Sequence, residues 1–260
     1  MKIRKMLRKT VFLVCFISAA VLLSAQDGQK DLHASLGQIP GYAETPDKGL
    51  YVDLFKVIDE IYTAGKIIIE IFPMPRSIDY AITGKSDFHA PILRNPSVDA
   101  SLLPYRMVKE ELGEVTLVIY SNADAPLTKE MIDKMLKEDK FLYSIECAGG
   151  MEALLPFPFS PTNNLENSLK KIESKRIDAL VWAQEEVDLL LRNLKAKSIH
   201  REYYQNMDDV IITQKGARGA EIDNALSDIL QKMKKTGRLQ EMYSKIHVPF
   251  KDWQPADMGW

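Results

Sequence analysis

Two arginines stand beside apolar segments in the first half of the chain. Arg76 follows the run KIIIEIFPM, and Arg94 ends the stretch FHAPILR, which also contains His89. An arginine enclosed in a site presents a fork of donors suited to a carboxylate, whereas an arginine on the surface needs no such partner. For Arg94 both interpretations stay open, and for Arg76 the pattern favours contact with an anionic group. For His89 it favours a half-buried, hydrogen-bonded imidazole over a ligand contact.

A pair of glycines lies in the segment ECAGGMEAL of the second half. We expect Gly149 and Gly150 to join a strand to a helix. Backbone amides at such a helix start favour an anionic group, and glycine lets that group approach closely. A plain tight turn explains the pair equally well. Cys147 is expected to be a small buried residue, because no His or Asp motif around it would activate the thiol.

Polar residues end the apolar segment RIDALVWA. Trp182, Gln184 and Glu185 stand there, where they could contact a bound molecule. Glu185 has a second explanation, since the helix dipole favours an acidic residue in the first turn of a helix. The next segment, QEEVDLLLRNLKA, has the pattern of such a helix.

Strands and helices alternate along the chain and must position these residues. The sequence predicts a strand over 31–37, a helix over 50–62, a strand over 66–73, a helix after residue 76 and a strand up to residue 94. A strand over 114–121 and a helix within 125–138 follow, and a second α/β series runs from 140 to 196. The strand 208–216 then precedes two amphipathic helices. This alternation is typical of an α/β protein with mostly parallel sheets.

The N-terminus has the pattern of a secretory signal peptide. The first nine residues carry five basic side chains, and the uncharged run 10–25 follows. We therefore expect cleavage after Ala25. Leu23 occupies a position where a small residue is usual, so an uncleaved membrane anchor is the alternative. Cys15 is a poor lipidation site, and we expect export to the periplasm without an acyl anchor.

Composition excludes some classes of function. Without residues 1–25 the chain has 235 residues, and it loses five of its 34 basic and none of its 36 acidic side chains, which leaves a net charge of −7. That balance argues against a nucleic-acid partner. Only Cys147 remains, so an internal disulfide is excluded and a buried core must supply the stability. No second apolar segment of membrane length follows, so the mature protein is expected to be soluble. The sequence shows no metal signature, nucleophile elbow or phosphate loop, and we expect no cofactor.

Three phrases, taken in their order and spacing, resemble those of a known family. ITGKSDFHAPIL resembles the helix, Gly, basic residue, Asp and strand phrase of the family 3 bacterial extracellular solute-binding proteins. KKIESKRIDALVW resembles its counterpart in the second lobe of those proteins, and ALSDILQKMKKTGRLQEMYSKI is similar to their C-terminal helices. The resemblance covers nearly the whole mature chain.

The resemblance implies a type II periplasmic-binding fold, in which two α/β lobes enclose a ligand cleft that closes by hinge motion. The first lobe would comprise residues 26–119 plus 206–260, and the second 120–205. Ligands of open α/β sheets bind beyond the carboxyl ends of the strands. The expected ligand-binding residues are therefore Tyr42, Arg76, His89 and Arg94 on the first wall, and Gly149, Gly150, Trp182, Gln184 and Glu185 on the second.

By the same resemblance the protein would be a monomeric, non-enzymatic substrate-binding protein of an ABC importer, which hands a small polar solute to a permease in the inner membrane. An amino acid or another carboxylate-bearing molecule is the expected ligand. Two alternatives stay open. One is a dehydratase-like enzyme on the same scaffold, with Glu185 or His89 as general acid or base. The other is a ligand-sensing partner of a membrane signalling protein.

Two positions depart from the amino-acid-binding members of that family. Those members carry a Thr-x-x-Arg segment that holds the ligand α-carboxylate, but the segment RNPSVDAS has no arginine at the usual place. They also carry an acidic residue at the end of the second-lobe strand, where Ala183 stands here. Another small polar or anionic ligand is therefore compatible with the sequence.

Overall fold

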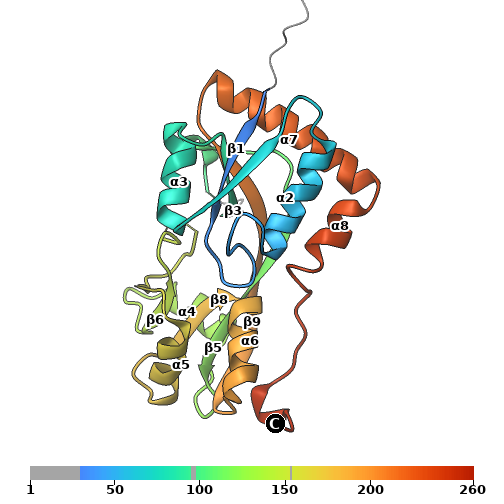
Figure 1. Cartoon of the computed structure of the whole chain (residues 1–260). Helices are drawn as coiled ribbons and strands as arrows, with labels where there is room; N and C mark the ends of the chain where they lie inside the picture. The colour runs from blue at the N-terminus through green and yellow to red at the C-terminus, as the bar shows by residue number, and fades with distance from the viewer. Residues whose placement is uncertain (1–29, 95–97, 153) are drawn as a thin grey trace, which may run out of the picture.

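The computed structural model describes residues 30–94, 98–152 and 154–260 (Figure 1). The expected signal peptide, residues 1–25, lies outside the described residues. The first half of the chain forms the predicted alternation, with β1 (Leu32–Gly37), α2 (Leu50–Ile61), β2 (Ile67–Phe72), α3 (Met74–Thr83) and β3 (Phe88–Arg94). Strand β1 lies between β2 and β3 and is parallel to both.

Alternation along the strands decides which helix each residue meets. In β1, Leu32, Ala34 and Leu36 belong to a core cluster with residues of α2, α7 (Ala217–Lys235) and α8 (Arg238–Tyr243). Because successive side chains of a strand point to opposite faces, Ser35 lies on the other face, where its hydroxyl donates to the Ser77 carbonyl of α3. The sheet is thus covered on both sides, as an α/β lobe requires.

Two long antiparallel strands connect this lobe to the rest of the chain. Strand β5 (Gly113–Asn122) pairs along its whole length with β9 (Ile199–Thr213). Strand β9 has 15 residues, about 50 Å at the usual rise of a strand, and its other end pairs with β3 and with the short β4 (Arg106–Met107). The sequence predicted this strand over 208–216, but β9 begins nine residues earlier, at Ile199. The first part of β9 is rich in polar residues, so the alternation of apolar and polar side chains that marks a strand is weak there.

The second lobe contains α4 (Lys129–Met135), β6 (Ile145–Ala148), β7 (Ser160–Thr162), α5 (Leu165–Glu173), β8 (Ala179–Ala183) and α6 (Gln184–Leu194). Strand β6 is parallel to β7 and β8, whereas β8 is antiparallel to β5. Among the described residues, the strands form one nine-stranded sheet in the order β2-β1-β3-β9-β5-β8-β6-β7, with β4 beside β9. The sheet therefore runs through both lobes, and β5 and β9 are the strands on which it crosses.

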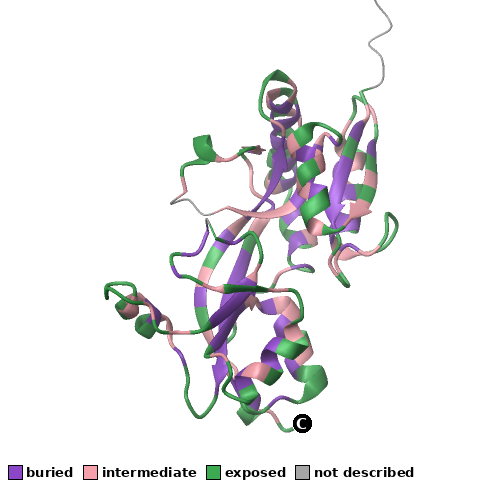
Figure 2. Cartoon of the chain, turned by 90° about the vertical axis from the view of Figure 1, so that its left-hand side faces the viewer, coloured by how far each residue is buried: buried purple, intermediate pink, exposed green. Residues whose placement is uncertain are grey.

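Buried residues follow the strands of each lobe (Figure 2). One core cluster belongs to the first lobe, and two others, on opposite faces of β5 and β8, belong to the second. Among the described residues, no helix is long and apolar enough to cross a bilayer. The connections also contain two short 3-10 turns, η1 (Ala100–Leu102) and η2 (Pro255–Asp257).

The end of the chain differs from the expected lobe boundaries. After α8 the chain leaves the first lobe and descends beside α6 of the second (Figure 1). There Phe250 and Trp253 pack against a core cluster that includes Leu191 and Ile199. Phe250 and Trp253 therefore pack with the second lobe, where the cluster covers part of their aromatic side chains.

Candidate ligand-binding site between the lobes

Side chains of both lobes lie within electrostatic reach of one another at the start of α6. Tyr42 belongs to the loop that follows β1 in the first lobe, whereas Glu185 and Glu186 belong to the first turn of α6 in the second. Burial, and then the negative charges of Glu185 and Glu186, raise the pKa of the Tyr42 phenol to about 12. Such an effect requires the phenol to lie within electrostatic reach of both carboxylates. Tyr42 and Glu185, both expected from the sequence, therefore lie within electrostatic reach of each other.

Glu186 presents a partly covered carboxylate at this place. Its Oε1 accepts a hydrogen bond of 3.0 Å from Trp182 Nε1, and no described residue donates a hydrogen bond to its other oxygen. Burial raises the pKa of Glu186, the Trp182 hydrogen bond lowers it and the nearby Glu185 raises it further. A carboxylate in this position attracts a cationic group. In the sequence, the two consecutive acidic residues of QEE could have indicated Glu186 as a candidate site residue. Acidic residues are, however, common in the first turn of any helix.

Glu185 itself is held by the protein. Its Oε2 lies 3.1 Å from His247 Nδ1, and its Oε1 accepts from the backbone N–H of Val248. The neighbouring Gln184 is only 2 % exposed and donates to the Val248 carbonyl. These two expected ligand residues thus contact the segment after α8. Their side chains fix the start of α6 rather than stand open.

A buried hydrogen-bonded network continues from His247 into the first lobe. The Tyr51 hydroxyl lies 2.8 Å from His247 Nε2 and donates a short hydrogen bond to Asp209. Asp209 is fully buried, and its Oδ2 accepts a second bond, of 3.1 Å, from the Tyr243 hydroxyl. Burial raises the pKa of the Asp209 carboxyl to about 6, although His247 and the two tyrosines oppose that rise. No motif marks these residues in the sequence, because each comes from a different element.

The buried interpretation of His89 agrees with its surroundings. His89 is fully buried on the α3 face of β3, with its Nδ1 2.6 Å from the Ser77 hydroxyl and 3.1 Å from the Ser35 carbonyl oxygen. Burial lowers the pKa of His89 to about 4, so the imidazole is neutral near pH 7. Its Nε2 has no hydrogen-bond partner among the described residues.

The two arginines differ in what surrounds them. Arg94 forms a fork with Asp208 on β9, with its Nε at 2.9 Å and its Nη2 at 2.8 Å from the same carboxylate oxygen. Arg76 is exposed in the first turns of α3, just beyond the carboxyl end of β2. Among the described residues its side chain has no hydrogen bond or ion pair. Arg94 is therefore paired within the crossing strands, and Arg76 is unpaired among the described residues.

Among the described residues, no helix begins directly after the two glycines. Gly149 and Gly150 form an exposed turn after β6, and the next helix, α5, begins only at Leu165. The prolines in LLPFPFSPT explain the difference, because proline in a helix interior removes a hydrogen bond and clashes with the preceding turn. Gly150 has a φ of 90°, a conformation that favours glycine. The pair therefore forms a turn, as the second interpretation predicts.

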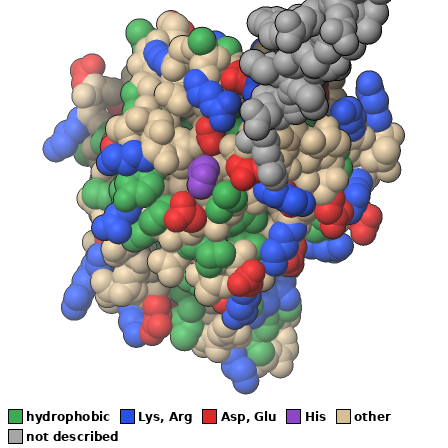
Figure 3. All heavy atoms as spheres, turned by 45° about the horizontal axis from the view of Figure 1, so that its top comes forward, with side chains coloured by type: hydrophobic (Ala, Val, Ile, Leu, Met, Phe, Trp, Pro, Cys, Tyr) green, Lys and Arg blue, Asp and Glu red, His purple; other side chains and the backbone are tan. Residues whose placement is uncertain are grey.

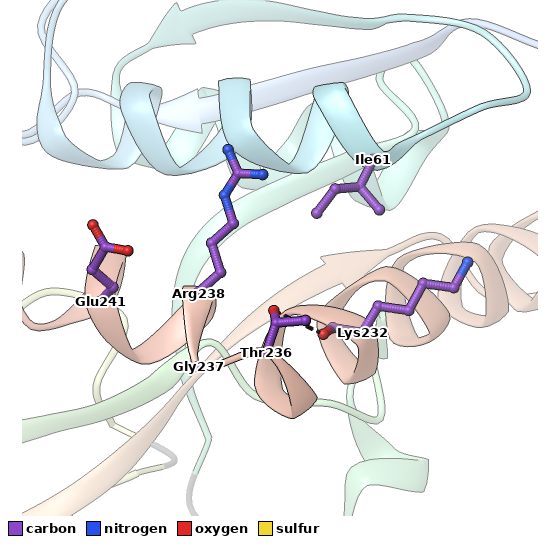
Figure 4. A pocket seen from close by; sticks show the side chains of 6 residues that line it. All are labelled: Ile61, Lys232, Thr236, Gly237, Arg238 and Glu241. Atoms are coloured by element: carbon purple, nitrogen blue, oxygen red, sulfur yellow. Dashed lines mark hydrogen bonds between the residues drawn. The ribbon is translucent and has the colours of Figure 1, made fainter.

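Other features of the surface lie away from this site. A hollow on the first lobe lies between the end of α2 and the junction of α7 with α8 (Figure 4), and it is lined by Ile61, Lys232, Thr236, Gly237, Arg238 and Glu241. Acidic and basic side chains are interspersed over the outer end of that lobe (Figure 3). Among the residues that the structure describes, no group of three or more His, Cys, Asp and Glu is placed to hold a metal ion.

No protein-family model and no curated protein matches the chain. Solved structures do match. The ligand-binding core of GluR0 from Nostoc punctiforme, in complex with L-glutamate, is 15% identical with a TM-score of 0.62, over 84% of this chain and 100% of that one. A histidine kinase sensor domain with similarity to periplasmic binding proteins is 14% identical with a TM-score of 0.63, over 85% and 97% of the two chains.

A third match is the probable amino-acid ABC transporter extracellular-binding protein ytmK from Bacillus subtilis, 15% identical with a TM-score of 0.58, over 83% of this chain and 97% of that one. Identities this low establish the fold alone. They agree with the order of elements and with the two-lobed sheet described above. The chain therefore has the two-lobed type II periplasmic-binding fold of the family 3 solute-binding proteins.

Proposed function

We propose that the protein is a receptor that binds a small amino-acid-like solute between its lobes. The observation that carries this proposal is that Tyr42 of the first lobe lies within electrostatic reach of Glu185 and Glu186 of the second. A ligand that contacts both walls favours the closed arrangement of the lobes, because it gains contacts there that neither wall offers alone. The proposed lobes are residues 26–119 plus 206–246 and residues 120–205, and residues 247–260 form a separate segment.

The ligand chemistry follows from the groups that remain open. Glu186 accepts a hydrogen bond from Trp182 and lies within electrostatic reach of the Tyr42 phenol. It suits an ammonium group, which a carboxylate and aromatic faces both attract. Arg76, at the edge where β2 ends, suits a carboxylate. A solute with both an amino and a carboxylate group could therefore bind Glu186 through the first and Arg76 through the second. Of the other expected contacts, Gly149 and Gly150 offer the backbone of an exposed turn, and His89, Arg94 and Gln184 stay in a supporting role.

Binding is tested by titration calorimetry on protein without residues 1–25, freed of co-purified solute by unfolding and refolding. A panel of amino acids and small carboxylates is titrated, and the tightest is carried to the variants. Glu186→Gln and Arg76→Ala should each weaken binding at least tenfold, about 1.4 kcal/mol. Glu130→Gln is the matched control, because Glu130 is an exposed acidic residue in the first turn of α4. If no solute binds, or if all variants bind alike, the proposal is wrong.

The biological role proposed is solute capture for an ABC importer in the periplasm. The neighbour ytmK is described as a probable ABC transporter binding protein, which supports this role. The histidine kinase sensor domain supports the second candidate, a sensing partner of a membrane signalling protein. Uptake of the labelled solute into cells with and without the gene separates the two roles. Loss of uptake favours transport, and unchanged uptake with a lost transcriptional response favours sensing. If the solute is unaltered after prolonged incubation with the protein, the alternative of a dehydratase-like enzyme is excluded.

A further inference from the structure

The last segment of the chain, His247–Trp260, makes a third connection between the lobes. It leaves the first lobe after α8 and runs along α6 of the second (Figure 1). Strands β5 and β9, the other two connections, are hydrogen-bonded to each other along β5 and so behave as one ribbon. A single ribbon allows the lobes to bend and twist about it. A separate attachment on another side of the lobe restrains that motion.

The segment is attached first at the start of α6. Both backbone polar groups of Val248 are used there, since its N–H donates to Glu185 Oε1 at 3.2 Å and its carbonyl accepts from Gln184 Nε2. His247 adds its contact of 3.1 Å with Glu185. Three contacts from two consecutive residues fix the position of the segment along α6.

The second attachment is built around a buried arginine of β9. Arg201 is only 1 % exposed, and it binds Asp188 of α6 through Nε at 2.7 Å and Nη2 at 2.6 Å. Its Nη1 donates to the backbone carbonyls of Lys251 and Trp253, at 3.2 and 2.7 Å. The guanidinium carbon lies 4.0 Å from the centre of the Trp253 ring. The segment thus supplies two acceptors and an aromatic cover to a cation that burial has removed from water.

A glutamine locks the segment to the same residue. Gln254 Oε1 accepts from the Arg201 backbone N–H at 2.9 Å, and Gln254 Nε2 donates to the Arg201 carbonyl at 2.8 Å. This pair of bonds imitates the pairing of a neighbouring strand at the free edge of β9. Undocking would leave the buried guanidinium and the edge of β9 without these partners, so the docked state is strongly favoured.

We propose that His247–Trp260 is a strap that restrains the rotation of the second lobe relative to the first, and that the Arg201 site is its anchor. The first residues of the strap are attached to Glu185, next to the proposed ligand contact at Glu186. The strap therefore restrains the lobes beside the proposed ligand site. The proposal concerns the ligand-free protein and does not depend on the identity of the solute.

The test measures the distance between spin labels on the two lobes of the ligand-free protein, at Asp79→Cys in α3 and Lys137→Cys after α4, both exposed positions. Electron double resonance gives the distribution of that distance. Trp253→Ala and Gln254→Ala should broaden the distribution and add a population outside the range of the parent protein. Lys251→Ala is the matched control, because its side chain is exposed and only its backbone contacts Arg201.

Circular dichroism and a cooperative unfolding transition establish that each variant is folded. A chain that ends at Ile246 serves as the second variant, and it should broaden the distribution further. If the folded variants keep the distribution of the parent protein, the strap does not restrain the lobes and the proposal is overturned. A broadened distribution in Lys251→Ala as well would also contradict it, since the anchor would then have no special role.

Discussion

The stability of the protein should depend on pH through Asp209. This carboxyl is fully buried, and burial raises its pKa from 3.8 to about 6. A difference of about two pKa units corresponds to about 3 kcal/mol between the protonated and ionised forms. The folded pKa lies above the unfolded one, so the stabilising contribution is fully present below about pH 4 and is lost as the pH rises through 6. Asp209→Asn removes this titration.

The assay is urea unfolding of the parent protein and of Asp209→Asn at several pH values between 4.5 and 7.5. The free energy of unfolding of the parent minus that of the variant should fall by about 2 kcal/mol across this range, since part of the loss already occurs below pH 4.5. The difference between the two free energies of unfolding isolates Asp209, because the other titrating groups contribute to the pH dependence of both proteins. Asp228→Asn, at an exposed position of α7, is the control and should give a flat difference. A difference for Asp209→Asn that stays constant within about 0.5 kcal/mol would refute the reasoning.

Three further results are expected. Arg201→Ala should lower the free energy of unfolding by about 3 to 5 kcal/mol in urea titrations, because it leaves the Asp188 carboxylate without its cationic partner; a loss below about 1 kcal/mol would contradict the buried ion pair. Burial raises the pKa of the Cys147 thiol to about 12, so a thiol reagent at pH 8 should react with it only after unfolding, and rapid reaction of the folded protein would contradict its burial. N-terminal sequencing of the exported protein should begin near Gln26, whereas a protein extracted from membranes that begins at Met1 would indicate a retained anchor.

Local patterns in the sequence determined the elements and the burial of several residues. The apolar stripe of 50–62 became α2, the β-branched run after Lys66 became β2, and the segment QEEVDLLLRNLKA became α6. His89 and Cys147 are buried, as their surroundings in the sequence favoured. Helical and strand periodicities are set by neighbouring residues, so short stretches carry them. The order of such stretches was enough to predict an α/β protein, and the resemblance to family 3 proteins supplied its two-lobed form.

The tertiary structure alone decided which candidate residues stay open to a ligand. Arg94 and Arg76 look alike in the sequence, yet Arg94 is paired with Asp208, 114 residues away, and Arg76 is not paired within the described residues. Glu185 looks like an open carboxylate at a strand end in the sequence, whereas in the structure its Oε2 lies 3.1 Å from His247 Nδ1, 62 residues later. The anchor of the strap depends in the same way on contacts between Arg201 and residues some 50 positions later. Such contacts depend on how distant elements pack, and no local period or spacing encodes that packing.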